Sequence, residues 1–390
     1  MKKSAVAVFF TVFFSLYGLI NAHILFTGLR VLPPVPGLTA VYVIGFLLLA
    51  SSFIVGRFLE RRWLSSVSTA FVWIGSFWLA AMLYFILACA LYDIFRVVAF
   101  LVPPFDRWMY SLGLPVGRAI AGGVVVLVIV ALVAGHINAF APRVRTLRLA
   151  IDKPINGGRL SIAMASDLHL GTIVGPRRCE AIVAALNALE ADLILLPGDL
   201  VDEDLGPVIR GNLGEKLRGL RAPLGVFAVT GNHEYIGGVE PAVRYLRDHA
   251  ITVLRDEVIE LPCGVTLAGR EDRSAGMGGI RRMELRKMLN GVDRSSPLIL
   301  MDHQPFHLNE AVDAGVDLQL SGHTHHGQLW PLNAITNAVY ELSWGYMKKV
   351  GTHFYVSCGV GTWGPPVRTG NRPEVVSIIL ESSQQSSPRL

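Results

Sequence analysis

The chain has 390 residues, of which 52% are hydrophobic and only 17% are charged, and its mean hydropathy is +0.47. This composition excludes an ordinary soluble protein. The first 142 residues hold nine Lys or Arg and three Asp or Glu, whereas the rest holds 26 and 27. Because the basic excess flanks apolar runs and forms no stripe with stacking aromatics, we expect it to set membrane topology, and we expect no nucleic-acid binding.

Residues 1–142 are predicted to form a transmembrane region of about four helices. A membrane span needs about 20 apolar residues, and four uncharged stretches are long enough: residues 5–29, 38–56, 67–92 and 119–141. The run between the third and fourth stretches contains Arg96, Pro103 and Pro104, which predicts an interfacial loop. Two lysines ahead of the first stretch also allow a signal peptide cleaved near residue 21.

The Lys and Arg residues beside the spans predict the orientation of the chain. One side holds eight of them and the other holds four, namely Arg30, Arg96, Arg107 and Arg118. The side with more basic residues faces the cytoplasm. It also carries the connection to the rest of the chain, so we expect an integral protein of the inner (cytoplasmic) membrane whose C-terminal domain is cytoplasmic.

Residues 143–381 are predicted to form an α/β domain, followed by a disordered tail at residues 382–390. Strand-like apolar runs occur at residues 160–165, 193–196, 226–229, 298–301, 318–320, 354–356 and 375–380. Apolar residues recur at helical spacing in residues 179–189 and 239–249. Alternating strands and helices indicate an open sheet, whose functional loops lie at one edge.

Each of the first five apolar runs is followed directly by a carboxylate, amide or imidazole side chain, the types that can bind metals. These are Asp167 and His169, then Asp199, then Asn232 and His233, then Asp302 and His303, and finally His323 and His325. Two metal ions about 3.5–4 Å apart activate water and neutralise the phosphoryl oxygens of a phosphate ester. Carboxylate, amide and imidazole ligands suit such a pair. The four cysteines are scattered without a C-x-x-C pair, so a structural zinc site is not expected.

The motifs D-x-H, G-D, G-N-H-E, a later H and G-H-T-H, in this order, resemble the calcineurin-like metallophosphoesterase superfamily. The resemblance covers residues 147–380. The run G-H-T-H-x-G-Q, together with W-G-P-P-V-R at residues 363–368 and P-E at residues 373–374, is similar to a bacterial branch of membrane-associated or exported phosphodiesterases. This resemblance implies a four-layer α/β/β/α sandwich with two mixed sheets between helical layers.

The resemblance also implies a role for each motif residue. The first divalent metal ion would be bound by Asp167, His169 and His325, and the second by Asn232, His303 and His323. Asp199 would bridge the two ions, which would be manganese, iron or zinc. His233 would lie beside the phosphate and orient it or protonate the leaving group. Asp202 matches the acidic residue that usually lies next to the metal ligands in this superfamily without binding the metal.

Three features lie outside these motif roles. Arg368 either grips a substrate phosphate or forms a surface ion pair. His326 replaces the glycine usual in this branch and is interpreted as a tolerated substitution. Apolar residues at helical spacing from Ile335 to Tyr346, with Val339 and Leu342 between them, form either core packing or a membrane-facing lip.

These features predict a dinuclear metal-dependent hydrolase of phosphodiester or pyrophosphate bonds at the membrane surface. Its expected partners are the lipid bilayer and a phosphate-ester substrate, which could be lipid-linked. Two alternatives are a phosphodiesterase of soluble cyclic or other nucleotides, and a membrane-bound metal-binding scaffold or sensor. The sequence does not indicate an oligomeric state.

Overall fold

The computed structural model describes residues 3–383, which divide into two compact units. One unit holds the chain up to His136 together with Gly364–Val367, and the other holds the remainder. The predicted disordered tail lies outside the described residues from position 384 onward.

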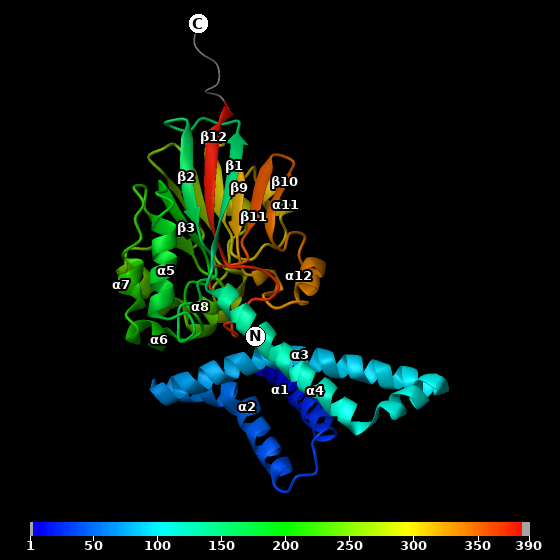
Figure 1. Cartoon of the computed structure of the whole chain (residues 1–390). Coiled ribbons are helices and arrows are strands. Elements are labelled where there is room, and N and C mark those ends of the chain that lie inside the picture. The colour runs from blue at the N-terminus through cyan, green and yellow to red at the C-terminus, as the bar shows by residue number, and fades with distance from the viewer. Residues whose placement is uncertain (1–2, 384–390) are drawn as a thin grey trace. The chain divides into compact units, whose positions relative to one another are not determined.

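The first unit consists mainly of long apolar helices, coloured blue to cyan in Figure 1. They are α1 (Lys3–Leu29), α2 (Leu38–Arg62), α3 (Ser66–Leu101) and α4 (Pro103–Ala139). Within residues 3–383, these four helices are long and apolar enough to cross a membrane. The predicted four-helix membrane region is confirmed.

The prediction of an interfacial loop between the third and fourth spans is wrong. α3 continues to Leu101, and α4 begins at Pro103 after a single residue. Proline is tolerated in the first turn of a helix, because its missing N–H would have no intrahelical partner there. The two prolines therefore start a helix. The interruption comes later, at Gly113, where φ is 67° inside α4.

Glycines allow α2 and α3 to pack closely. A Cβ atom at Gly75 would lie 2.3 Å from Cα of Phe53, and one at Gly56 would lie 2.7 Å from the backbone nitrogen of Val72. Small residues at helix contacts permit this approach in membrane proteins, where van der Waals packing drives association. A 3.0 Å hydrogen bond from Trp78 Nε1 to Asn21 Oδ1 ties α3 to α1. These three helices therefore pack on one another.

The second unit contains two six-stranded mixed sheets (Figure 1). The first has the order β1 (Arg143–Ile151), β12 (Glu374–Ser382), β2 (Arg159–Met164), β3 (Leu193–Pro197), β4 (Val226–Val229) and β5 (Thr252–Leu254). The second has the order β10 (Gly345–Lys349), β11 (Thr352–Val356), β9 (Leu318–Ser321), β8 (Leu298–Met301), β7 (Thr266–Gly269) and β6 (Glu257–Glu260). The neighbours from β2 to β5 are parallel, as are β11, β9, β8 and β7.

Apolar side chains from both sheets form one buried core between them, including Leu195, Val229, Leu267, Ile299 and Ile378. Helices lie outside the sheets (Figure 1). They are α5 (Pro176–Asn187), α6 (Leu205–Arg210), α7 (Leu213–Leu217), α8 (Asn232–Gly237), α9 (Val239–Asp248), α10 (Leu285–Met288), α11 (Asn309–Asp313) and α12 (Asn333–Val339). A second apolar cluster packs α10 and α11 against β8 and β11. This arrangement confirms the predicted α/β/β/α sandwich.

The apolar residues at helical spacing from Ile335 to Tyr346 do not lie on one helix. α12 ends at Val339, and Tyr346 lies in strand β10. Leu342 packs against the second apolar cluster, as the core interpretation requires. In contrast, Ile335 is 60% exposed and Val339 is 57% exposed, so the helix presents an apolar face outside the core.

Candidate metal centre

The metal-binding motifs occupy the loops at the carboxyl ends of β2, β3, β4, β8 and β9. The backbone turns sharply in these loops. Left-handed φ angles occur at six motif residues: Asp167, His169, Asp199, His323, His325 and His326. Such angles cost a residue with a Cβ about 1–3 kcal/mol, and they cluster at functional sites where the surrounding fold imposes them. The fold therefore turns the side chains of Asp167, His169, Asp199, His323 and His325 towards one place.

One group of candidate ligands consists of Asp167, His169 and His325, whose ligand atoms all lie within 4.8 Å of one another. All three residues are buried. The Nε2 atoms of His169 and His325 are 2.9 Å apart, and His325 Nε2 is 3.5 Å from Asp167 Oδ1. Two imidazole nitrogens that face each other this closely must share a proton or a cation. Asp167 is held in place by the backbone N–H of His323, which donates to its carboxylate at 2.9 Å.

A second group consists of Asp199, His303 and His323, again within 4.8 Å. Asp199 Oδ2 lies 3.1 Å from His303 Nε2, while His303 Nδ1 lies 2.8 Å from the carbonyl of Pro197. Asn232 Oδ1 is 2.8 Å from His323 Nδ1. Asp199 Oδ2 also lies 3.8 Å from His169 Nε2, so the carboxylate is shared between the two groups.

The residues present fit a pair of divalent cations. His169 Nδ1 is a buried nitrogen without a hydrogen-bond partner in the described structure, and His303 Nε2 faces the Asp199 carboxylate at 3.1 Å. Burial is expensive for unpaired polar atoms, and it is tolerated where the atom serves a metal. Burial also lowers the pKa of His169 to about 3, against the opposing charges of Asp199 and Asp202, so this imidazole is neutral and able to bind a metal. Nitrogen and oxygen donors without thiolate suggest a dinuclear divalent site.

His233 lies at the edge of both groups. Its backbone N–H donates to Asp199 Oδ1 at 2.9 Å, and its Nδ1 is 3.2 Å from Asp202 Oδ1. Burial lowers the pKa of His233, but the charges of Asp199 and Asp202 outweigh this effect and raise the pKa to about 9. His233 also forms a group within ligand distance with His169 and Asp199. Geometry alone therefore allows it to be a proton donor or a ligand.

Glu234 has a positioning role that sequence reasoning missed. Its buried carboxylate accepts backbone N–H bonds from Asp199 at 3.2 Å, Val201 at 2.9 Å and Gly231 at 2.7 Å. It thereby ties the loop after β3 to the loop after β4. Glu234 is the final residue of the G-N-H-E motif, so it could have been singled out from the sequence. However, no local sequence pattern distinguishes a carboxylate that accepts backbone hydrogen bonds.

Two glycines are required by close contacts within the centre. A Cβ atom at Gly231 would lie 2.1 Å from Asp199 Oδ1. Gly198 has φ +86°, and a Cβ atom there would lie 2.4 Å from His303 Nδ1. Only glycine combines this backbone conformation with this proximity.

Arg368 is fully buried, which excludes the surface ion pair considered from the sequence. Its guanidinium donates to the carbonyls of Cys358 at 2.9 Å and Gly361 at 2.7 Å, and to Asn371 Oδ1. Its Nη2 is also 3.3 Å from His325 Nδ1. Asn371 in turn donates to the carbonyl of His325 at 2.5 Å. These contacts favour a role in positioning His325 over a grip on substrate.

His326 faces away from the candidate ligands. Its Nδ1 is 2.9 Å from Ser343 Oγ, and its ring lies 5.1 Å from that of Trp344. Its left-handed φ of 44° is a conformation that glycine adopts freely, which explains why glycine is usual there.

Comparison with known families gives one match over the centre of the second unit. Residues 160–327 match the family described as calcineurin-like phosphoesterase, a segment that contains every candidate ligand. Arg368 lies beyond it.

Similar proteins occur in bacteria and animals. An uncharacterised metallophosphoesterase of Aquifex aeolicus is 33% identical over 249 residues, covering 63% of this chain and 94% of the relative. One from Helicobacter pylori strain J99 is 34% identical, covering 63% of this chain and 65% of the relative. A Bos taurus protein, called transmembrane protein with metallophosphoesterase domain, is 34% identical, with coverages of 64% and 60%. The chain thus spans less than two thirds of the length of the Helicobacter pylori and Bos taurus relatives.

Proposed function

The chain belongs to the calcineurin-like phosphoesterase family and is a metal-dependent phosphoesterase, and from this premise we propose that it hydrolyses phosphodiester or pyrophosphate bonds at a membrane surface. The observation that carries the proposal is that the carboxylate of Asp199 lies between the two groups of ligands, near His169 of one and His303 of the other. A bridging carboxylate holds two cations close enough to act on one phosphoryl group.

The ligands in this proposal are those expected from the sequence. Asp167, His169 and His325 would hold one ion, Asn232, His303 and His323 the other, and Asp199 both. Two bound divalent ions supply a nucleophile at neutral pH and neutralise the phosphoryl oxygens. We infer manganese, iron or zinc, because imidazole ligands suit iron and zinc, and the carboxylate and amide oxygens of the same set suit manganese.

The protein's own groups would orient the substrate and move the proton. His233 would donate a proton to the leaving oxygen, with Asp202 holding its Nδ1 and directing Nε2 away from that carboxylate. Glu234 would hold the backbone of Asp199 in place against the G-N-H-E loop. Arg368 and Asn371 would keep His325 turned towards Asp167.

The test is metal-dependent hydrolysis by the purified full-length protein. We expect about two metal ions per chain by elemental analysis. We also expect hydrolysis of bis(p-nitrophenyl) phosphate that is lost with a chelator and restored by Mn²⁺, Fe²⁺ or Zn²⁺. Saturation at one ion would contradict the dinuclear mechanism. Full metal loading without hydrolysis of any diester or pyrophosphate would instead favour the scaffold or sensor.

A lipid-linked substrate is supported by apolar surface next to the centre. Tyr340 directly follows the exposed Val339, and its ring lies 6.1 Å from the ring of His323 and 4.7 Å from that of Phe306. Trp363, which is 54% exposed, has its ring 6.1 Å from that of His233. Exposed aromatic and apolar side chains beside a polar site suit a substrate with an acyl chain.

Replacing exposed apolar residues on α12 tests this substrate class. Ile335→Ser with Val339→Ser is expected to lower kcat/KM for a vesicle-presented lipid diester, because the acyl chain loses its contact surface, while a small soluble diester is hydrolysed as before. The matched control is Ile209→Ser on α6, since Ile209 is 56% exposed. Equal losses on both substrates would argue against lipid contact. Wild-type preference for cyclic nucleotides would favour the soluble alternative.

The four apolar helices indicate a membrane protein. We propose that it lies in the inner (cytoplasmic) membrane with residues 143–381 as the catalytic domain in the cytoplasm, from the eight basic residues on one side against four on the other.

Orientation is tested with reporters fused after Leu390. A cytoplasm-active fluorescent protein is expected to fluoresce there, whereas alkaline phosphatase, which is active only after export, is expected to be inactive. Protease added to intact spheroplasts is expected to leave the catalytic domain whole. Cleavage from outside, with active phosphatase, would reverse the orientation.

A further inference from the structure

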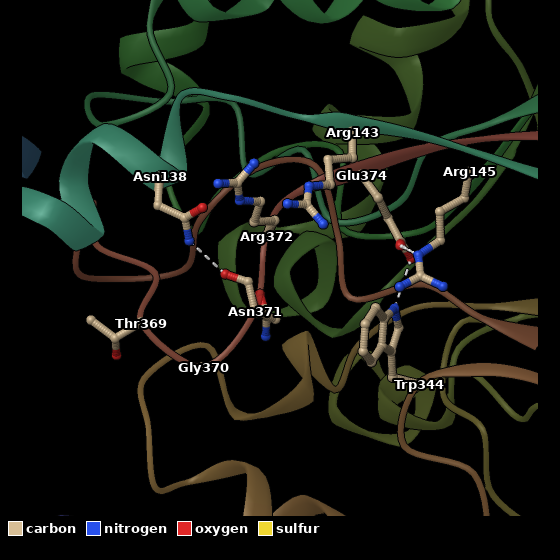
Figure 2. Close-up of a pocket in the computed structure, with 9 residues that line it drawn as sticks. All are labelled: Asn138, Arg143, Arg145, Trp344, Thr369, Gly370, Asn371, Arg372 and Glu374. Carbon is tan, nitrogen blue, oxygen red and sulfur yellow. Dashed lines mark hydrogen bonds and ion pairs between the residues drawn. The ribbon is translucent and has the colours of Figure 1, made fainter.

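The second unit contains a polar pocket of about 320 Å³ that none of the candidate metal ligands lines (Figure 2). The residues that matter for its chemistry are Asn138, Arg143, Arg145, Trp344, Asn371 and Arg372, with Glu374 at one side. They come from the last turn of α4, the start of β1, the loop before β10 and the loop before β12. The fold thus brings together three arginines from two distant segments.

The pocket carries an unbalanced positive charge. Its single carboxylate, Glu374, is buried and lies 3.0 Å from Arg145 Nε, and it also accepts hydrogen bonds from Trp344 Nε1 and Tyr355 OH at 3.1 Å. Glu374 therefore neutralises Arg145. Among residues 3–383, no carboxylate forms an ion pair with Arg143 or Arg372, and Figure 2 shows both guanidinium groups reaching into the pocket. Two uncompensated guanidinium groups favour an anion.

The site is built in advance of any ligand. Asn138 Nδ2 donates to the carbonyls of Arg368 at 2.8 Å and Asn371 at 2.7 Å, which fixes the loop that carries Arg372. The backbone N–H of Arg143 donates to the carbonyl of Pro373 at 2.8 Å, so the two arginines are held beside each other by the pairing of β1 with β12. Planar guanidinium groups match the geometry of phosphate oxygens.

The place of the pocket in the chain indicates where such a phosphate comes from. Asn138 lies within the last turn of α4, whose candidate span ends at Ala139, and Arg143 follows four residues later. Four extended residues reach at most about 14 Å, which keeps Arg143 near the membrane surface. The ring of Trp344 lies 4.3 Å from the Arg145 guanidinium, and tryptophan is enriched at that depth.

We propose that this pocket binds the phosphate group of an anionic lipid headgroup, as a site separate from the metal centre. Arg143 and Arg372 bind the phosphate oxygens, and Trp344 with Arg145 forms the wall. The proposal does not depend on hydrolysis, because neither Arg143 nor Arg372 contacts a candidate ligand. A lipid held here ties the start of the catalytic domain to the bilayer surface.

Native mass spectrometry of the full-length, metal-loaded protein in neutral detergent tests the proposal. Phosphatidylglycerol is expected to bind more tightly than zwitterionic phosphatidylcholine. Arg143→Ala with Arg372→Ala is expected to weaken phosphatidylglycerol binding roughly tenfold or more. The control is Arg210→Ala with Arg221→Ala, which removes the same charge from exposed positions. Arg372→Gln alone is a second variant. It leaves β1 unchanged and keeps Arg143, which is one of the eight basic residues that predict the orientation.

The results with the pocket variants decide whether this pocket binds a lipid phosphate. Weaker lipid binding in the pocket variants, with control-like melting temperature and unchanged hydrolysis of a soluble diester, supports the site. Wild-type lipid binding in both pocket variants overturns it. Equal binding of phosphatidylcholine also overturns it, because charge then plays no part. Displacement of the lipid by an equal concentration of glycerol 1-phosphate shows that a free phosphate ester is the ligand and overturns the lipid assignment.

Discussion

Asp199→Asn is expected to reduce hydrolysis to background and to lower the metal content from two ions per chain to one or fewer. Asp199 Oδ2 faces both groups of candidate ligands, at 3.1 Å from His303 Nε2 and 3.8 Å from His169 Nε2. An amide has no charge to offset two cations and offers only one oxygen as a ligand. Elemental analysis and diester hydrolysis on the same preparation measure both effects.

The matched control is Asp248→Asn at the exposed end of α9, which makes the same chemical change away from the centre. It is expected to keep two metals and full activity. Asp199→Asn protein that retains two tightly bound ions would show that another residue bridges them. A fall in melting temperature that metal addition does not reverse would point to a structural role for Asp199, through its bond from the His233 backbone N–H.

His233→Ala is expected to lower kcat by about 10²–10⁴-fold while two metals stay bound. The loss is expected to be smallest for p-nitrophenyl esters and largest for alkyl esters, because an alkoxide leaving group needs the proton most. The measurement is kcat across leaving groups of rising pKa, with metal content determined in parallel. This pattern separates proton donation from simple positioning.

Metal loss in His233→Ala equal to that in Asp199→Asn would instead identify His233 as a ligand, which its grouping with His169 and Asp199 permits. His307→Asn serves as the control, because His307 is exposed and asparagine tolerates its left-handed φ of 55°. A uniform loss across all leaving groups with metals intact would leave His233 with an orienting role only.

The strands that carry ligands were predictable because each is a short apolar run ended by a motif. All seven predicted runs coincide with strands, from β2 to β12, and both predicted helices with α5 and α9. Strand β1 escaped prediction because most of its side chains are exposed and several are arginines, so it lacks an apolar pattern. Its pairing partner β12 lies more than 200 residues away, with Arg143 opposite Glu374.

The residues of the candidate site could likewise be predicted from the sequence, but the contacts that hold them in place could not. The sequence places Asp167, Asp199, Asn232, His303 and His323 directly after five strands, and neighbouring parallel strands bring such ends to one edge of each sheet. The structure adds Glu234 as the tie between two loops and buries Arg368 against backbone carbonyls. Those partners are chosen by packing between loops, which leaves no periodic trace in the sequence.

The four spans, the strand runs and the ligand types could all be predicted from the sequence, because hydrophobic length, strand periodicity and donor chemistry are local properties. The end of α12 at Val339, the neutralisation of Arg145 by Glu374 and the meeting of Arg143 with Arg372 in one pocket were visible only in the folded chain. The three arginines and Glu374 come together because β1 pairs with β12, a strand more than 200 residues away, and no local pattern in the sequence specifies that pairing.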